Sequence, residues 1–153
     1  MDCSTAAFCL SLSSIPGSIH AGTADRTNEM GKRRVLIVED HADLRRLYAV
    51  GLNQRGFEVR LAANGAEAID RIEETRPHVL VLDLCMPIMD GWEVIERLAA
   101  SANPDIPVVV VSGYGQPEGK EMPPAVRGWL SKPATIDELA RTLDSISPLA
   151  DAC

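Results

Sequence analysis

Short apolar runs and amphipathic segments alternate through most of this chain. The runs at 35–38, 79–82 and 106–111 consist almost wholly of Val, Leu and Ile, which is typical of strands buried on both faces of a parallel sheet. At 57–61 apolar residues alternate with charged ones, so we expect a half-buried strand at an edge of the sheet. A fifth, short strand is predicted at 128–131.

Between these strands, apolar residues recur every three to four positions, which predicts amphipathic helices. We expect helices at 41–54, 66–75 and about 91–100, and a last helix that begins near Thr135. Acidic residues in the first turn of that last helix suit the positive end of its dipole. The residues expected to face the core are Leu44, Leu47, Tyr48 and Leu52 in the first helix, Ala68, Ile69 and Ile72 in the second, and Val94, Ile95 and Leu98 in the third.

Five strands, each followed by a helical segment, predict an α/β fold with one doubly wound parallel sheet. One connection departs from this pattern, because the segment between Ser112 and Trp129 is rich in glycine and proline. Both residue types disfavour helix. We therefore expect the fourth helix of the series to be shortened or replaced by a loop.

The chain has 153 residues, a hydrophobic fraction of 46% and a formal net charge of −7 at pH 7, values that allow a globular domain with a real core. Because nucleic-acid binding needs clustered Lys and Arg, the acidic charge argues against nucleic acid as a partner. No apolar run reaches the roughly 20 residues of a membrane-spanning helix, so we expect no membrane partner and a cytoplasmic location. The 4 cysteines lack paired metal or redox spacing, so reduced thiols are expected.

The start of the chain differs in composition from the rest and is rich in Ser, Ala and Thr. Its mildly apolar patch lacks the preceding basic residues of a secretory signal, so we interpret residues 1–30 as a disordered extension or a start site assigned too early. The folded domain is expected to span 31–149, followed by a tail at 150–153. So short a tail leads us to expect no output domain of its own, and action through contact with other proteins.

Carboxylates follow two of the buried runs. Glu39 and Asp40 come directly after 35–38, and Asp83 follows 79–82. Because an open α/β sheet binds its ligands at the C-terminal ends of its strands, we expect the first and third strands to be neighbours and the three carboxylates to meet at that edge. Clustered acids repel one another unless a cation joins them, and an all-oxygen site suits Mg²⁺.

Two further polar residues follow the fourth and fifth strands. Ser112 and Lys132 bring a hydroxyl and an ammonium to the same edge of the predicted sheet. Phosphoryl transfer depends on positioning and charge neutralisation more than on covalent help. Carboxylates, a hydroxyl, an ammonium and Mg²⁺ at one place therefore indicate a phosphoryl-transfer site.

In this order and at strand ends, these residues resemble the receiver domain of two-component response regulators, from residue 33 to about residue 147. The resemblance implies a flavodoxin-like sheet with strand order 2-1-3-4-5. It implies that Asp83 accepts a phosphoryl group from the phosphohistidine of a histidine kinase or histidine phosphotransfer protein. It also implies that phosphorylation changes contacts with a downstream protein target, in a protein that is a monomer or a phosphorylation-linked dimer.

The resemblance also assigns roles to the other residues of the site. Mg²⁺ would be bound by Asp40 and Asp83, by Glu39 through a water, and by the main-chain carbonyl of Cys85. Lys132 would contact Asp83 and the phosphoryl oxygens, and Ser112 would move in to hydrogen-bond these oxygens. Trp129 would be the aromatic switch residue, with Tyr114 as an alternative. Pro133 would follow a cis peptide bond.

Two other functions remain open from the sequence. A pseudo-receiver would share the fold and bind partners without being phosphorylated, although the full set of site residues argues against it. A hydrolase of the haloacid dehalogenase type also uses an aspartyl nucleophile and Mg²⁺, but that class has a second Asp two residues later, where this chain has Cys85. We therefore expect no enzymatic activity beyond the protein's own phosphorylation and dephosphorylation.

Overall fold

The computed structural model describes residues 31–146 of the chain. The extension expected at 1–30 and the tail expected at 150–153 lie outside the described residues, as do residues 147–149. Within the described part, five strands and four helices follow one another along the chain. None of these helices has the length and apolar character needed to cross a membrane.

The strands form one parallel sheet in the order β2-β1-β3-β4-β5, which is the predicted order. Their bounds are Arg34–Val38 for β1, Glu58–Ala62 for β2, Val79–Leu82 for β3, Val108–Ser112 for β4 and Val126–Ser131 for β5. In the β1–β3 pair, Val38 lies opposite Leu82. The prediction that the first and third strands are neighbours is therefore confirmed, and the residues that follow these two strands emerge side by side.

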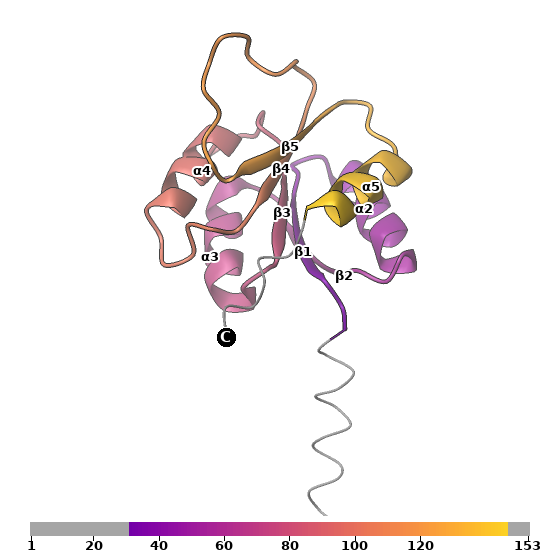
Figure 1. Ribbon diagram of the computed structural model, residues 1–153. Coiled ribbons are helices and arrows are strands. Elements are labelled where there is room, and N and C mark those ends of the chain that lie inside the picture. Colours follow the sequence, from indigo (N-terminus) through magenta and orange to yellow (C-terminus); the bar gives the residue numbers. More distant parts are fainter. Residues whose placement is uncertain (1–30, 147–153) are drawn as a thin grey trace, which may run out of the picture. The chain divides into compact units, whose positions relative to one another are not determined.

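Two helices cover each face of the sheet, α2 and α5 on one side and α3 and α4 on the other (Figure 1). Their bounds are Ala42–Gln54 for α2, Gly65–Thr75 for α3, Gly91–Ala99 for α4 and Ile136–Ser145 for α5. The last helix begins where the sequence predicts it. Thr135 caps it in a capping box with Glu138, which satisfies free N–H groups of the first turn.

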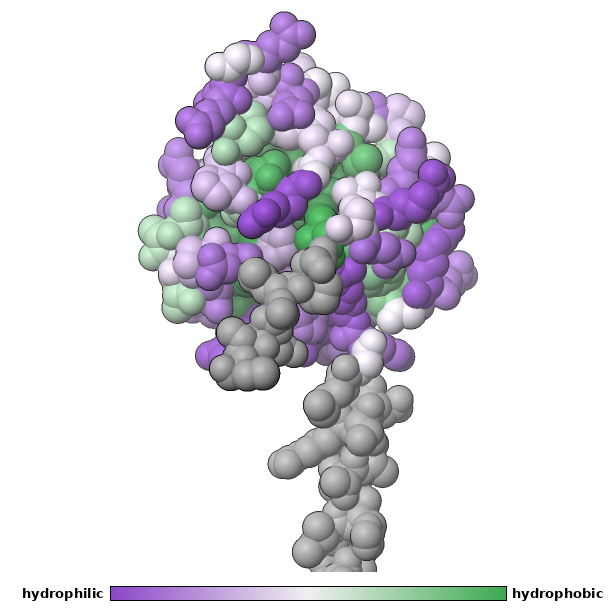
Figure 2. All heavy atoms as spheres, viewed as in Figure 1, coloured by the Kyte–Doolittle hydropathy of each residue, from purple (hydrophilic) through white to green (hydrophobic). Residues whose placement is uncertain are grey.

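The two faces of the sheet bury separate sets of apolar side chains. Successive residues of a strand point to opposite faces, so each continuous apolar run serves both cores. In β1, for example, Leu36 and Val38 pack under α3 and α4, whereas Val35 and Ile37 pack under α2 and α5. Hydrophilic side chains cover much of the outer surface on the face that Figure 2 shows.

In α2, Tyr48 and Leu52 are buried as predicted, but one residue expected to face the core is not. Leu47 of α2, expected in the core, is 57% exposed. The buried side of this helix consists of Tyr48, Ala49, Gly51 and Leu52. The expected inward stripe is therefore wrong at Leu47, because small residues on the neighbouring side let α2 pack closely.

Between β4 and β5 the described chain forms a loop, residues 113–125, in place of a helix. This loop rises above the C-terminal ends of the strands at the top of Figure 1. The expectation of a shortened or missing fourth helix is therefore confirmed.

Candidate functional site

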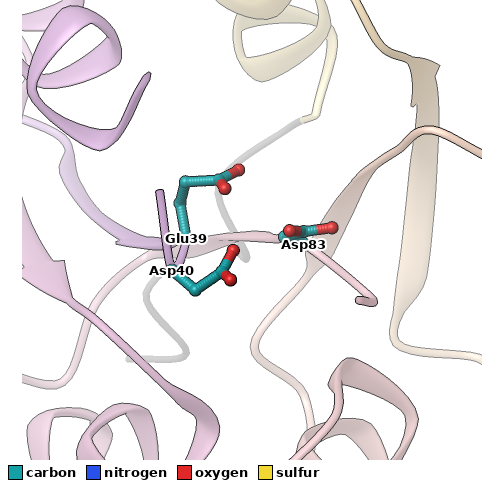
Figure 3. Close-up of side chains that lie close together, drawn as sticks. All are labelled: Glu39, Asp40 and Asp83. Atoms are coloured by element: carbon teal, nitrogen blue, oxygen red, sulfur yellow. The ribbon is translucent and has the colours of Figure 1, made fainter. Parts of the chain in front are cut away.

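Three carboxylates meet at the C-terminal edge of the sheet. Glu39 and Asp40 follow β1, Asp83 follows β3, and one oxygen of each lies within 4.8 Å of the other two. Figure 3 shows the carboxyl groups of Glu39 and Asp40 directed toward the side on which Asp83 lies. Glu39 is 2% exposed and Asp83 4% exposed, whereas Asp40 lies open to solvent. The predicted cluster therefore exists, with two acids buried and one at the rim.

Backbone hydrogen bonds fix the segments that carry these acids. The Asp83 N–H donates to the Val38 carbonyl at 3.0 Å, and the Glu39 N–H donates to the Ala62 carbonyl at 3.2 Å. These bonds continue the strand pairing beyond the ends of β1 and β3. The buried acids are thus held by a rigid sheet, which favours a well-defined site.

Arg45 of α2 fixes the turn that carries the acid pair. One of its guanidinium nitrogens lies 2.7 Å from the carbonyl oxygen of Glu39 and 3.4 Å from that of Asp40. The His41 N–H donates to a carboxylate oxygen of Glu39 at 3.2 Å. Arg45 therefore acts on the main chain and sets the direction in which the two acidic side chains leave it.

Lys132, which follows β5, brings positive charge to the acids. Its ammonium nitrogen lies 2.8 Å from Oε2 of Glu39 and 3.1 Å from Oδ2 of Asp83. The Lys132 N–H donates to the Ser112 carbonyl at 2.8 Å, and the peptide bond between Lys132 and Pro133 is cis. The ammonium therefore bridges acids from two neighbouring strands.

Burial and neighbouring charges shift the pKa values of two groups at this site. Burial raises the pKa of Glu39 and the Asp83 charge raises it further, although the hydrogen bond from Lys132 opposes this. Burial alone would lower the pKa of Lys132, but its hydrogen bonds and charge interactions with Glu39 and Asp83 outweigh burial and raise it. The contacts with Glu39 and Asp83 therefore favour the charged form of Lys132, whereas burial disfavours the charged form of Glu39.

These charges fit a divalent cation. Three carboxylates face one ammonium, and the clustered side-chain donors of the acids are oxygen atoms, which hard cations such as Mg²⁺ prefer. Glu39, Asp40 and Asp83 are the side chains that would hold the ion. Cys85 lines the same cavity, which places its main chain beside them.

The loop after Asp83 lies tightly against the carboxylate. Oδ1 of Asp83 accepts a hydrogen bond from the Cys85 N–H at 3.1 Å, and the Gly91 N–H donates to the Leu84 carbonyl at 3.0 Å. A Cβ at position 91 would lie 2.6 Å from the Asp83 carbonyl oxygen, so glycine is required there. The start of α4 therefore packs directly on the backbone of Asp83.

Ser112 lies at the end of β4 and is fully buried. Its hydroxyl oxygen accepts a hydrogen bond from the Tyr114 N–H at 3.1 Å. Ser112 lines an apolar cavity next to the acidic one, and the exposed Tyr114 lines both. In this hydrogen bond the Ser112 oxygen is only an acceptor, so the hydroxyl proton remains free to donate to another group.

Trp129 of β5 is half buried and packs against the core under α3 and α4. Its ring lies next to that of Trp92 in α4, with centroids 6.2 Å apart. Its indole N–H is buried without a hydrogen-bond partner among the described residues. Trp129 therefore lies beside the apolar cavity and in contact with α4.

The sequence pattern does not single out Arg45 or Trp92 as parts of this region. Arg45 matters through contacts with the main chain, which no residue pattern encodes. Trp92 lies three positions before Ile95, so its place on the apolar stripe of α4 is the signal that could have located it.

Comparisons with known proteins agree with this geometry. A family model described as the response regulator receiver domain matches residues 35–144. The chain is 36% identical over 115 residues to the transcriptional regulatory protein PrrA of Mycobacterium leprae, a match that covers 74% of this chain and 49% of PrrA. It is 32% identical over 124 residues to the sporulation initiation phosphotransferase F of Bacillus subtilis, covering 78% of this chain and 98% of that protein. The chain thus spans about half the length of PrrA.

Solved structures show the same fold. The chemotaxis protein CheY4 of Vibrio cholerae matches with a TM-score of 0.67 and 27% identity, covering 76% of this chain and 99% of CheY4. The response regulator TrrA of Thermotoga maritima, solved in complex with Mg(2+)-BeF, matches with a TM-score of 0.66 and 25% identity, covering 74% of this chain and 97% of TrrA.

Proposed function

The chain belongs to the response regulator receiver domain family, and from that premise we propose that it accepts a phosphoryl group on Asp83. The donor is the phosphohistidine of a histidine kinase or a histidine phosphotransfer protein. A carboxylate oxygen of Asp83 forms a bond to phosphorus, the P–N bond breaks, and the imidazole leaves with the electron pair. Water later hydrolyses the acyl phosphate, which releases inorganic phosphate and restores the carboxylate.

One observation carries this proposal: the buried carboxylate of Asp83 contacts the ammonium of Lys132 and lies beside the acids that follow β1. A phosphoryl group brings negative charge to a carboxylate that is itself negative. The reaction therefore needs cationic groups on the side that the phosphoryl group enters. Lys132 is one such group, and a metal ion held by Glu39 and Asp40 would be the other.

The chain's own residues position and neutralise the reacting groups. The Cys85 N–H orients Asp83 by donating to Oδ1, while Lys132 pairs with Oδ2. The same ammonium is close enough to pair with the phosphoryl oxygens as they gain negative charge. Mg²⁺, when bound, supplies further neutralisation of the phosphoryl oxygens.

We also propose that phosphorylation changes contact with a downstream protein. The protein would catalyse only its own phosphorylation and dephosphorylation. The similarity to a sporulation phosphotransferase over 98% of that protein supports a role in phosphoryl transfer between proteins. We propose a cytoplasmic location for the domain, because it would meet such a donor there.

Incubation with acetyl phosphate and Mg²⁺, followed by intact-mass measurement, tests the proposal. We expect the mass to increase by one phosphoryl group, and chelation of Mg²⁺ to prevent this. Absence of the adduct in the presence of both reagents would support the pseudo-receiver. Repeated turnover of an ester such as p-nitrophenyl phosphate would support a hydrolase of the haloacid dehalogenase type.

A further inference from the structure

The chain has 2 tryptophans, and they lie against each other near the functional edge of the sheet. Trp92 is in the first turn of α4 and Trp129 is in β5, with ring centroids 6.2 Å apart and an interplanar angle of 40°. Both side chains are half buried. Tilted aromatic pairs at such a distance attract each other beyond the area that they bury. The pair therefore joins α4 to β5.

Trp92 also holds the loop of residues 113–125. The ammonium of Lys120 in that loop lies 4.9 Å from the centroid of the Trp92 ring, which is a cation–π contact. Lys120 is exposed, so burial does not force this position on it. Pro117 of the same loop lines the apolar cavity together with Trp92. The loop that replaces a helix is thus tied to α4 through the indole of Trp92.

The loop and the two rings surround a cavity of about 360 Å³. This apolar cavity shares Cys85 and Tyr114 with the acidic cavity, so the two adjoin. Apolar side chains are visible in Figure 2 beneath the loop that projects at the top. The cavity gives the loop and Trp129 room to shift without displacing the close-packed core.

The loop that joins β3 to α4 connects Trp92 to Asp83. Asp90 caps α4, and the Gly91 N–H donates to the Leu84 carbonyl at 3.0 Å. Position 91 has no space for a side chain between α4 and the Asp83 carbonyl. A displacement of the loop after Asp83 would therefore displace the first turn of α4 and Trp92 with it.

We propose that Trp92 is a positioning residue that transmits the state of Asp83 to the 113–125 loop and to Trp129. The trigger rests on the proposed phosphorylation of Asp83. Because the indole contacts Lys120 and Trp129 at the same time, a movement of the first turn of α4 changes both contacts together. Trp92 acts through these contacts and takes no part in the phosphoryl transfer itself.

The test compares Trp92→Phe with Trp92→Leu in the full chain. Phe keeps a ring face for Lys120 and a partner for Trp129, whereas Leu keeps only apolar volume. Hydrogen exchange of residues 113–125 is measured before and after treatment with acetyl phosphate and Mg²⁺, with the phosphoryl adduct counted by intact mass. In both variants Trp129 is the remaining tryptophan, so its emission reports on β5 directly.

Before phosphorylation, we expect hydrogen exchange of the 113–125 loop to be about two- to fivefold faster in the Leu variant than in the parent, because an exposed cation–π contact is lost. Exchange in the Phe variant should stay near the parent's. Lys120→Gln should reproduce the faster exchange, and the matched control Glu118→Gln should not. After phosphorylation, loop exchange and Trp129 emission should change in the Phe variant. They should stay unchanged in the Leu variant, although it carries the same adduct.

Equal loop exchange in the parent, Phe and Leu proteins before treatment would overturn the inference. So would a Leu variant whose loop responds to phosphorylation as the parent's does. If the parent itself forms no adduct, the proposed function fails instead, and exchange in the untreated proteins still decides whether Trp92 anchors the loop.

Discussion

The ammonium of Lys132 lies 2.8 Å from a carboxylate oxygen of Glu39, although 93 positions separate the two residues in the chain. Glu39 is buried after β1, and the Lys132 side chain is 24% exposed after β5. The same ammonium lies 3.1 Å from Asp83, which follows β3. The sheet therefore brings three distant segments together around one positive charge.

Removal of this charge should destabilise the metal-free protein. Lys132→Met leaves two buried carboxylates uncompensated, so we expect the free energy of unfolding to fall by about 3 kcal/mol in the presence of a chelator. Urea unfolding followed by circular dichroism measures this change. Lys120→Met, at an exposed lysine, is the control and should cost less than about 1 kcal/mol. Equal losses in the two variants would contradict the account of the Lys132 contacts.

Binding of Mg²⁺ should depend on the side chain of Asp40 but on the main chain of Cys85. Asp40→Asn should weaken Mg²⁺ binding at least about tenfold with little change in stability, because Asp40 is exposed and its carboxylate would be a direct ligand. Cys85→Ser should leave Mg²⁺ affinity within about twofold of the parent's, because a carbonyl oxygen is the same in both residues. Calorimetric titration measures both affinities. A large loss with Cys85→Ser would indicate that the thiol itself takes part.

The raised pKa of Glu39 predicts how the stability of the metal-free protein depends on pH. A folded-state pKa above the ordinary value of 4.5 means that the folded state binds this proton more tightly than the unfolded state. The associated stability is fully present below the ordinary pKa and is lost as pH rises through the raised value. Glu39→Gln lacks this titration, so the parent should lose stability relative to the variant as pH rises above the ordinary value of 4.5. Chemical unfolding in chelator at several pH values measures the difference, and a gain by the parent would contradict the prediction.

Gly91→Ala tests the close packing of α4 on the backbone of Asp83. The added Cβ would lie 2.6 Å from the Asp83 carbonyl oxygen and 2.8 Å from the Leu84 Cα, and neither backbone atom can move aside easily. We expect a loss of about 2–3 kcal/mol in unfolding free energy and weaker binding of Mg²⁺. Gly113→Ala is the matched control, since a Cβ there meets nothing within 4 Å. Similar stability of the two variants would rule out this packing constraint.

The neighbouring first and third strands and the acidic cluster could be predicted from simple patterns, whereas the full strand order came from the resemblance to receiver domains. Continuous apolar runs identify strands buried on two faces, and carboxylates directly after two of them must lie at one edge if the strands are neighbours. The strand bounds were less predictable. The sequence predicts a fifth strand from Gly128, but β5 begins at Val126. Gly128 thus lies inside the strand, where a Cβ would meet Thr142 at 2.8 Å.

The inward face of α2 shows why apolar periodicity alone misplaced one residue. Leu47 matches the helical spacing but is 57% exposed, while the small Ala49 and Gly51 are buried. A Cβ at Gly51 would lie 2.6 Å from Ile136, so the absence of a side chain lets the start of α5 approach. Hydropathy gives glycine little weight, and close approach of this kind becomes visible only in three dimensions.

Intact-mass measurement of the parent, Asp83→Asn and Asp90→Asn after treatment with acetyl phosphate and Mg²⁺ tests most directly whether Asp83 is the phosphoacceptor. Asp90 is an exposed acid in the same loop whose helix-capping role asparagine can retain, so Asp90→Asn is the matched control. We predict one phosphoryl adduct on the parent and on Asp90→Asn, and none on Asp83→Asn. An adduct that persists in Asp83→Asn, or no adduct on the parent, would contradict the account.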